Sequence, residues 1–296
     1  MSTAIGAEGH FGYRLEGSFG SGGAVEYYVP ILSEDVQLIH ANVYSDRIAN
    51  TAAQVGGQSG NKSVTGTIEL PICPQTNAAM WRAILGQETS PFYMERPLKS
   101  LAIEVDRSTD AILASGCMVS SAAVSSNTGG EVNMSLTLEG MDLNDTTATS
   151  PSYTSGDSIP YLHSDGVFTL DGTEDTSITA WSLNIDNSLV TDLYGTQKIR
   201  LDIPAGKGAV TGSFTKLFDD TTERDKFLTG DVVSFKAKFS RGSNDLVFWI
   251  PKAKYDSRPS PMSGQSEYIL ETFNFTAYVD DPDTEQSLRI SGDVSA

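Results

Sequence analysis

Two stretches of this sequence, VTGTIELPICPQTNAAMWRAILG (residues 64–86) and VTGSFTKLFDDTTERDKFLTG (residues 210–230), decide its fold. Each begins with Val-Thr-Gly in a segment where apolar and polar residues alternate, as in a strand with one buried face. Each continues into a helical segment and ends on a glycine, the residue that commonly terminates a helix. The shared order and nearly equal length indicate two copies of one structural unit.

Two further matches occur in the same order along the chain. Downstream, residues 110–143 align without a gap with residues 245–278, which superposes two strands in each half. Upstream, the strand near residues 36–44 corresponds to the strand near residues 178–189. Because three matches follow one order, we interpret the chain as an internal duplication.

The boundaries of the two copies follow from these matches. We predict a first module over residues 1–145, a linker over residues 146–165 and a second module over residues 166–296. The linker is rich in small and polar residues, and each module has the size of an ordinary domain. Short alternating strands with a single helix per module predict a mainly β protein.

Three strands have a clear polar face opposite their apolar face. In a barrel with water inside, such faces would line the channel. The candidate residues of this kind are Glu69, Glu139, Asp186, Thr65, Thr67, Ser182 and Asn184.

The charge of the chain is strongly acidic. Its 296 residues carry a formal net charge of −18, and Lys and Arg are not clustered as a nucleic-acid cradle would require. An acidic surface suits DNA that must slide without sticking, but on charge alone solubility is the better explanation.

No group of residues has the pattern of a catalytic or cofactor site. His10, His40 and His163 lack metal-ligand spacing to one another and to the cysteines. Cys73 and Cys117 stand among apolar residues, as buried free thiols do. We therefore expect neither an enzyme nor a bound cofactor.

The sequence resembles a known family, the major tail tube proteins of long-tailed phages (siphophages), of the two-module kind near 300 residues. The resemblance covers nearly the whole chain, although Ser18 stands where a bulky aromatic residue is common. Its carriers are Glu16, Phe19 and Gly20, then YYVPILSED (27–35), SVTGTIELPI (63–72) with Gly86, WSLNIDNSL (181–189), and AVTGSFTKLFDDTTERDKFLTG (209–230).

The resemblance implies an architecture and a role. Each module would be a β-sandwich with one short α-helix, and strands of neighbouring subunits would join one β-barrel around a channel. Six modules per ring imply three chains, a homotrimeric pseudo-hexamer, with a ring of six whole chains as the alternative. Stacked rings would form the tail tube through which the genome is delivered.

The resemblance also implies partners. The chain would bind copies of itself, the tape-measure protein and passing double-stranded DNA in the lumen, and tail terminator and distal tail proteins at the tube ends. The protein would belong to the virion tail. The opening residues lack a secretion signal and no apolar run is long enough for a membrane span, so we expect assembly in the host cytoplasm.

Two long, weakly patterned segments, residues 48–63 and 190–207, precede the Val-Thr-Gly strands and are candidates for loops that reach the next ring. Two other functions remain compatible with the sequence. One is a related ring component, a tail hub or the tube of a contractile injection device, and the other is an Ig-like adhesin. The candidate ring-stacking residues are Ile48, Gln54, Ser63, Val190, Tyr194 and Lys207.

Overall fold

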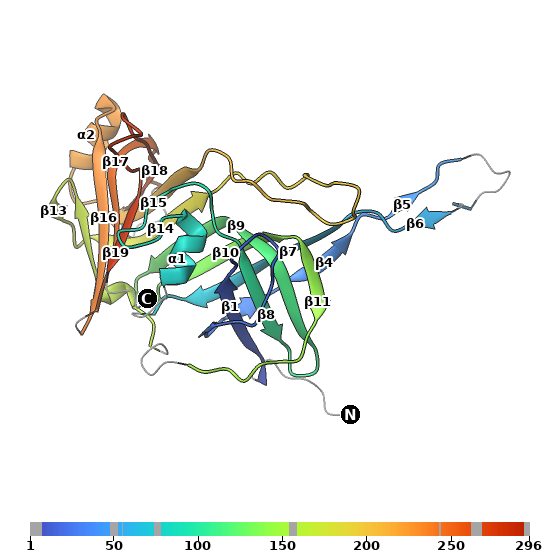
Figure 1. The fold of residues 1–296 in the computed structure, drawn as a ribbon. Coiled ribbons are helices and arrows are strands. Elements are labelled where there is room, and N and C mark those ends of the chain that lie inside the picture. The colour runs from blue at the N-terminus through green and yellow to red at the C-terminus, as the bar shows by residue number, and fades with distance from the viewer. Residues whose placement is uncertain are drawn as a thin grey trace.

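The computed structural model describes residues 8–47, 53–54, 56–73, 78–153, 159–242, 244–261 and 268–292 (Figure 1). Most of them lie in strands. The elements are β1 (His10–Leu15), β2 (Tyr27–Val29), β3 (Ser33–Glu34), β4 (Gln37–His40), β5 (Val43–Tyr44), β6 (Gly57–Gln58), β7 (Lys62–Pro71), α1 (Ala78–Leu85), β8 (Leu101–Asp106), β9 (Ala111–Asn127), β10 (Asn133–Gly140), β11 (Asp142–Asp145), the 3-10 turn His163–Asp165, β12 (Gly166–Leu170), β13 (Thr173–Glu174), β14 (Ile178–Asp186), β15 (Ala209–Leu217), α2 (Thr222–Thr229), β16 (Val233–Arg241), β17 (Asn244–Ser257), β18 (Leu270–Ala277) and β19 (Arg289–Gly292).

The first module is a sandwich whose two layers share the long strand β9. The N-terminal part of β9 pairs with β8 and β11, and its C-terminal part pairs with β10. Between these parts Gly116 has a φ of 62°, and an added Cβ would lie 2.8 Å from a side-chain atom of Met141. Glycine is therefore required where the strand passes from one layer to the other. Strands β1 and β2 complete the first layer, and β7 with β3 and β4 completes the second.

The helix α1 packs against β9 and β1 and reaches the second module. Trp81 is fully buried, and its ring meets that of Phe248 edge-on with centroids 5.8 Å apart. Phe248 also contacts Trp181, so one apolar core runs through both halves of the chain. Contacts of this kind make the two modules one packed body.

The second module repeats the strand pairings of the first. The pairs β1–β8, β8–β9, β9–β10, β10–β7 and β7–β4 recur as β12–β16, β16–β17, β17–β18, β18–β15 and β15–β14. The irregularities recur as well. The ladder between β8 and β9 shifts register between Leu101 and Ile103, and the ladder between β16 and β17 shifts between Val233 and Phe235. Bulges are specific local features, so their repetition is stronger evidence for a duplicated module than a shared pattern of strands is.

A second bulge also recurs, at Ser120 in β9 and at Asp256 in β17. When the two Val-Thr-Gly strands are aligned, the observed strand pairings give an alignment that differs from the ungapped match of residues 110–143 to 245–278. The difference is one residue in β17 and two residues in β18. The sequence match was wrong in this detail, because alternation identifies the face of a strand and not the position along it.

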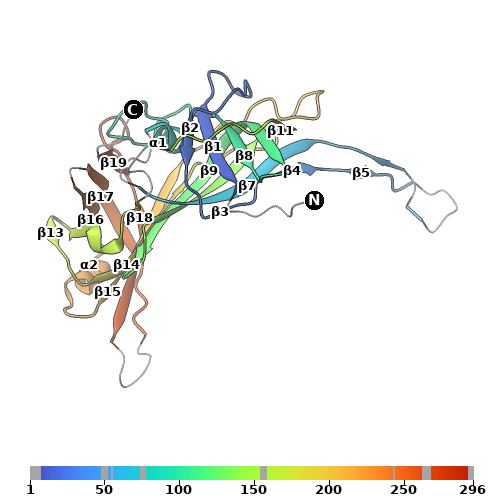
Figure 2. The same ribbon diagram turned by 90° about the horizontal axis from the view of Figure 1, so that it is seen from below.

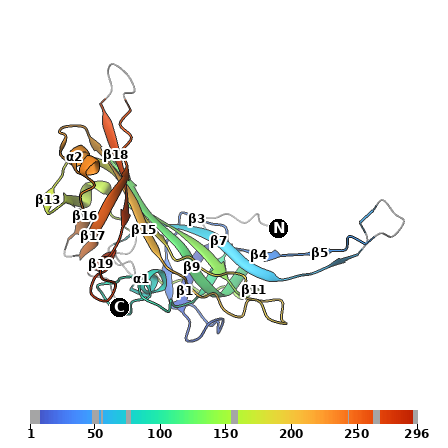
Figure 3. The same cartoon turned by 90° about the horizontal axis from the view of Figure 1, so that it is seen from above.

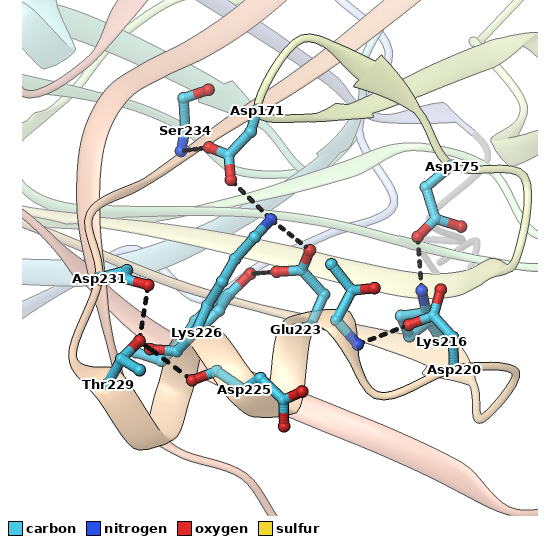
Figure 4. A network of polar contacts seen from close by, with 12 residues as sticks. Asp171, Asp175, Lys216, Asp220, Glu223, Asp225, Lys226, Thr229, Asp231 and Ser234 are labelled. Atoms are coloured by element: carbon cyan, nitrogen blue, oxygen red, sulfur yellow. Dashed lines mark hydrogen bonds and ion pairs between the residues drawn. The ribbon is translucent and has the colours of Figure 1, made fainter.

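The two helices have corresponding positions and different surroundings. Helix α1 packs against β9 and α2 against β17. Trp81 is buried, whereas Phe227 is half-buried and Leu228 is 71% exposed. Helix α2 is anchored by charge instead, since Lys226 Nζ lies 2.7 Å from both Glu223 and Asp171 (Figure 4).

Next to α2, Lys216 pairs with Asp175 at 2.8 Å (Figure 4). Burial alone would raise the pKa of Asp175, but hydrogen bonds donated by Lys216 and Ser177 outweigh it and hold that pKa below its ordinary value. This carboxylate is therefore charged in the folded protein at neutral pH.

The two modules join by strand pairing. Strand β14 of the second module pairs with the C-terminal part of β9 in the first, from Ala180 opposite Asn127 to Asp186 opposite Ser121. The result is one continuous antiparallel sheet in the order β4, β7, β10, β9, β14, β15, β18 and β17. Figures 2 and 3 show this sheet curving through the molecule, with α1 and β1 on its convex side.

Candidate channel-lining face

The curved sheet has one apolar and one polar face. The side chains of the apolar face, such as Ile68, Leu136 and Leu183, are buried in the core. The opposite side chains are exposed or half-buried, and we refer to this side as the polar face. It consists of the outward residues of β7, β10, β9, β14, β15 and β18 and is continuous across both modules.

The cross-strand register arranges the polar face in rows of hydroxyl and amide groups. Within them, the hydroxyls of Ser182 and Ser213 lie 2.9 Å apart and those of Thr215 and Thr272 lie 2.8 Å apart. Such cross-strand pairs stabilise a sheet without apolar contact. One row runs through Asn133, Ser125, Ser182, Ser213, Asn274 and Ser257, and the next through Glu69, Ser135, Ala123, Asn184, Thr211 and Thr276.

All seven residues selected from the sequence for this role lie on the polar face. Thr65 lies opposite Glu139 on β10, and Ser182 lies opposite Ser125 on β9. The structure thereby brings together, on one surface, residues that the sequence places in separate strands. The seven are Glu69, Glu139, Asp186, Thr65, Thr67, Ser182 and Asn184.

The charges on this face are few and mostly negative. The described residues of β7, β10, β9, β14, β15 and β18 contribute to it the carboxylates of Glu69, Glu139 and Asp186 and no Lys or Arg, whereas the edge strand β17 adds the exposed Lys254 opposite Thr276. Glu139 is neutralised by Arg200, whose guanidinium lies 2.8 Å away. The charges open to solvent are therefore Glu69 and Asp186 on these strands and Lys254 at the β17 edge.

The loop between β14 and β15, residues 187–208, lies along one rim of the sheet. The guanidinium of Arg200, which is 6% exposed, donates hydrogen bonds to the carbonyls of Gly140 and Thr191 at 2.9 and 2.8 Å. Ile203 is fully buried against Leu98 and Met118 of the first module. This docking was not found from the sequence, because residues 187–208 contain several apolar residues and only the fold shows that Ile203 is buried.

The comparison with known proteins agrees with this architecture. The sequence model of a family described as "Phage tail tube protein" matches residues 6–277, most of the chain. The chain belongs to the phage tail tube protein family. Its role is therefore that of a structural component of the virion tail. No individually curated protein matches the sequence.

The candidate ring-stacking residues of this tail tube protein fall into two groups. Ile48 lies outside the described residues, Gln54 is exposed in the arm that carries β5 and β6, and Ser63 lies in β7 opposite Ile39. Figure 1 shows that arm extending far from the body of the sheet. The second group is on the rim loop: Val190 and Lys207 are exposed there, and Tyr194 pairs with Arg200 in an isolated β-bridge.

The histidines and cysteines of the tail tube chain have local structural partners. His10 shares a hydrogen bond of 3.0 Å with Glu104, and His163 one of 2.9 Å with Ser126. Cys73 and Cys117 are buried free thiols, and burial raises the pKa of Cys117. No cluster of three or more His, Cys, Asp and Glu that could hold a metal ion occurs within the described residues. The same residues contain no helix long and apolar enough to cross a membrane.

Proposed function

We propose that this protein polymerises as stacked rings and that the polar face of its sheet lines the channel through which the phage genome passes. The observation that carries the proposal is the curved eight-strand sheet, which has one bare polar face and an open edge at each end. Strand β4 forms one edge, and the C-terminal part of β17 forms the other. In the part of the chain that the structure describes, neither has a partner on its outer side.

Open edges favour association between copies. An unpaired edge exposes backbone N–H and C=O groups to any other strand, and closing a sheet on itself removes the exposure. The junction of β9 with β14 is an example of two modules joined by such edges within one chain. Repeating that junction between chains makes a head-to-tail contact that closes into a ring.

The repeated pairings and bulges support the view that the chain holds two copies of one module. If six modules complete a ring, three chains with eight strands each form a barrel of 24 strands. With about 4.8 Å between strands and a tilt of about 40°, its circumference is about 150 Å and its backbone diameter about 48 Å. Such a channel is wide enough for a DNA duplex after side chains have filled part of it.

The chemistry of the polar face suits passage rather than binding. Basic side chains attract DNA by releasing its counterions, and this attraction would retain the duplex. The polar face has hydroxyl and amide rows, the carboxylates of Glu69 and Asp186, and the isolated Lys254 at its β17 edge. Such a face leaves a hydrated wall without a basic cluster. The tape-measure protein would occupy the same lumen before DNA, and the proposal requires no catalytic step.

The rim loop supports a role in stacking. Its exposed apolar side chains Val190, Leu193 and Leu201 are 46, 44 and 56% exposed, and they lie at the end of the sheet where the next ring would sit. Exposed apolar residues gathered on one rim favour burial against another molecule. Tail terminator and distal tail proteins would cover the same surfaces at the two ends of the tube.

Cysteine labelling of assembled tubes tests the lumen assignment. Ser125→Cys places a thiol on the polar face, and Ser240→Cys places one at an exposed position of β16 on the opposite side. We expect a maleimide on a large polymer to modify Ser240→Cys and not Ser125→Cys in tubes, and to modify both in dissociated protein. Equal modification of both positions in intact tubes, or purified protein that forms no rings in negative-stain images, would contradict the proposal.

A further inference from the structure

We infer that the seam between neighbouring chains repeats the seam inside one chain and pairs β4 of one copy with residues 256–258 of a second copy. The inference rests on the proposed ring and adds the residues that join its members. Within the described residues, neither segment pairs with a strand on its open side, and the internal junction supplies the template for both.

The template is the pairing of β9 with β14. Asp186 lies opposite Ser121, and the backbone N–H of Asn187 donates to the carbonyl of Ser120 at 2.8 Å. Because hydrogen-bonded pairs alternate along an antiparallel ladder, Ile185 and Ala122 form the next hydrogen-bonded pair and Asp186 with Ser121 a non-hydrogen-bonded pair.

Because the two modules repeat the same strands, each residue of the internal junction has an equivalent residue at one of the open edges. Ser120 and Asp256 are the bulge residues of β9 and β17, so Ser121 corresponds to Ser257. On the other strand, Gln37 pairs with Thr65 as Asn184 pairs with Thr211, in the two Val-Thr-Gly segments.

Counting from these anchors gives the register of the seam. Ile39 corresponds to Asp186, and it would lie opposite Ser257 of the second copy in a non-hydrogen-bonded pair. Leu38 opposite Arg258 and His40 opposite Asp256 would be the hydrogen-bonded pairs. Ile39 is 43% exposed and Ser257 is exposed, so both are accessible for such a contact.

The prolines after β17 favour pairing at this edge. The backbone N–H of Thr272 donates to the carbonyl of Pro259 at 3.0 Å, so Pro259 directs its backbone toward β18. Successive residues of an extended strand face opposite sides, and Pro261 therefore faces the same way as Pro259. The positions at which the two prolines lack an N–H group therefore face β18. The backbone N–H groups of Arg258 and Ser260 face the opposite, open side of the edge. A protected edge has the reverse arrangement, with the proline nitrogen toward solvent.

The other edge is closed on one side of the predicted contact. The N–H of Val36 donates to Glu34 at 3.0 Å, and its carbonyl accepts a hydrogen bond of 2.9 Å from Arg107. Arg107 also holds Glu34 through two contacts of 2.8 Å. This clamp satisfies the backbone before β4 and confines the seam to residues 38–40.

The same correspondence places the arm with β5 and β6. The arm follows β4 as the rim loop follows β14, and the rim loop docks on the module that contains β9. The arm would therefore lie along the second module of the neighbouring copy. Val43 and Tyr44, which are 63 and 55% exposed in the single chain, would be covered there.

Disulfide trapping in assembled tubes tests this register. Cysteines at non-hydrogen-bonded positions of an antiparallel pair bring their Cβ atoms close enough for a bond. We expect the double variant Ile39→Cys with Ser257→Cys to form covalent multimers under a mild oxidant. The ladder on a non-reducing gel should end at three chains. The native cysteines are both buried and give little background.

The matched control moves one cysteine by a single residue. In His40→Cys with Ser257→Cys the exposed His40 is replaced, and the two new side chains lie on opposite faces of the sheet, so we expect no ladder. Tubes that form normally but cross-link equally in both variants, or only in the control, would overturn the seam and leave the proposed function standing. Protein that forms no rings would overturn the proposed function itself.

Discussion

Trp81 gives the sharpest test of the packing that makes the two modules one body. Its side chain is fully buried, and its ring centroid lies 5.8 Å from that of Phe248 in the second module. Replacing a buried tryptophan with alanine costs about 3–5 kcal/mol, because apolar contact is lost and a cavity remains. At about 2–4 °C per kcal/mol for a chain of this size, the melting temperature of Trp81→Ala should fall by about 6–20 °C.

Two variants serve as controls for this measurement. The indole N–H of Trp81 has no hydrogen-bond partner among the described residues, so Trp81→Phe keeps most of the ring and should cost less than about 1.5 kcal/mol. Trp249 is 37% exposed beneath Arg289, and Trp249→Ala should cost about 1 kcal/mol.

Chemical denaturation of the three variants, followed by negative-stain imaging, gives both stability and assembly. We expect Trp81→Ala to unfold at clearly lower denaturant and to form few or no tubes, because the angle between the modules depends on this core. A Trp81→Ala protein as stable as Trp249→Ala, with normal tubes, would refute the assignment of α1 as the element that holds the modules together.

Three other predictions follow from the same contacts. Arg200→Ala leaves Glu139 without its partner and should cost about 2–4 kcal/mol and expose residues 187–208 to limited proteolysis. Arg224→Ala, at a half-buried position whose guanidinium pairs with the neighbouring Asp225, should change neither. The unfolded chain binds a proton at Asp175 more readily than the folded one, so this carboxylate stabilises the protein above its ordinary pKa of about 3.9, and its contribution is lost as the pH falls. Asp175→Asn should therefore be less stable than wild type at pH 7 in urea titrations, with the difference shrinking below about pH 4. Asp186→Lys should still form tubes, and these should retain short duplex DNA in co-sedimentation at low salt more than wild-type tubes do, an attraction that added salt should remove.

The sequence predicted the mainly β fold and the family, and both are confirmed. Alternation was sufficient for this, because a strand with one buried face must place apolar residues at every second position. It also identified the polar side of each strand correctly, as the register of Thr65 with Glu139 and of Ser182 with Ser125 shows.

Other features depend on contacts between segments that are distant in the chain. The packing of Ile203 against Leu98 and Met118 requires the rim loop to cross another module, and no local pattern encodes that path. The register of β17 and β18 depends on bulges, which a period of two cannot locate. The support of α2 by Lys226 depends on Asp171, which is 55 residues away in sequence.

Symmetry-averaged electron microscopy of the assembled tube tests the central claim most directly, because it shows which surface faces the channel and how many chains complete a ring. We expect three chains per ring with pseudo-sixfold modules, and a lumen formed by the polar face with Glu69 and Asp186 pointing inward. A ring of six chains whose second module decorates the outside, or a lumen lined mainly by Lys and Arg, would contradict it.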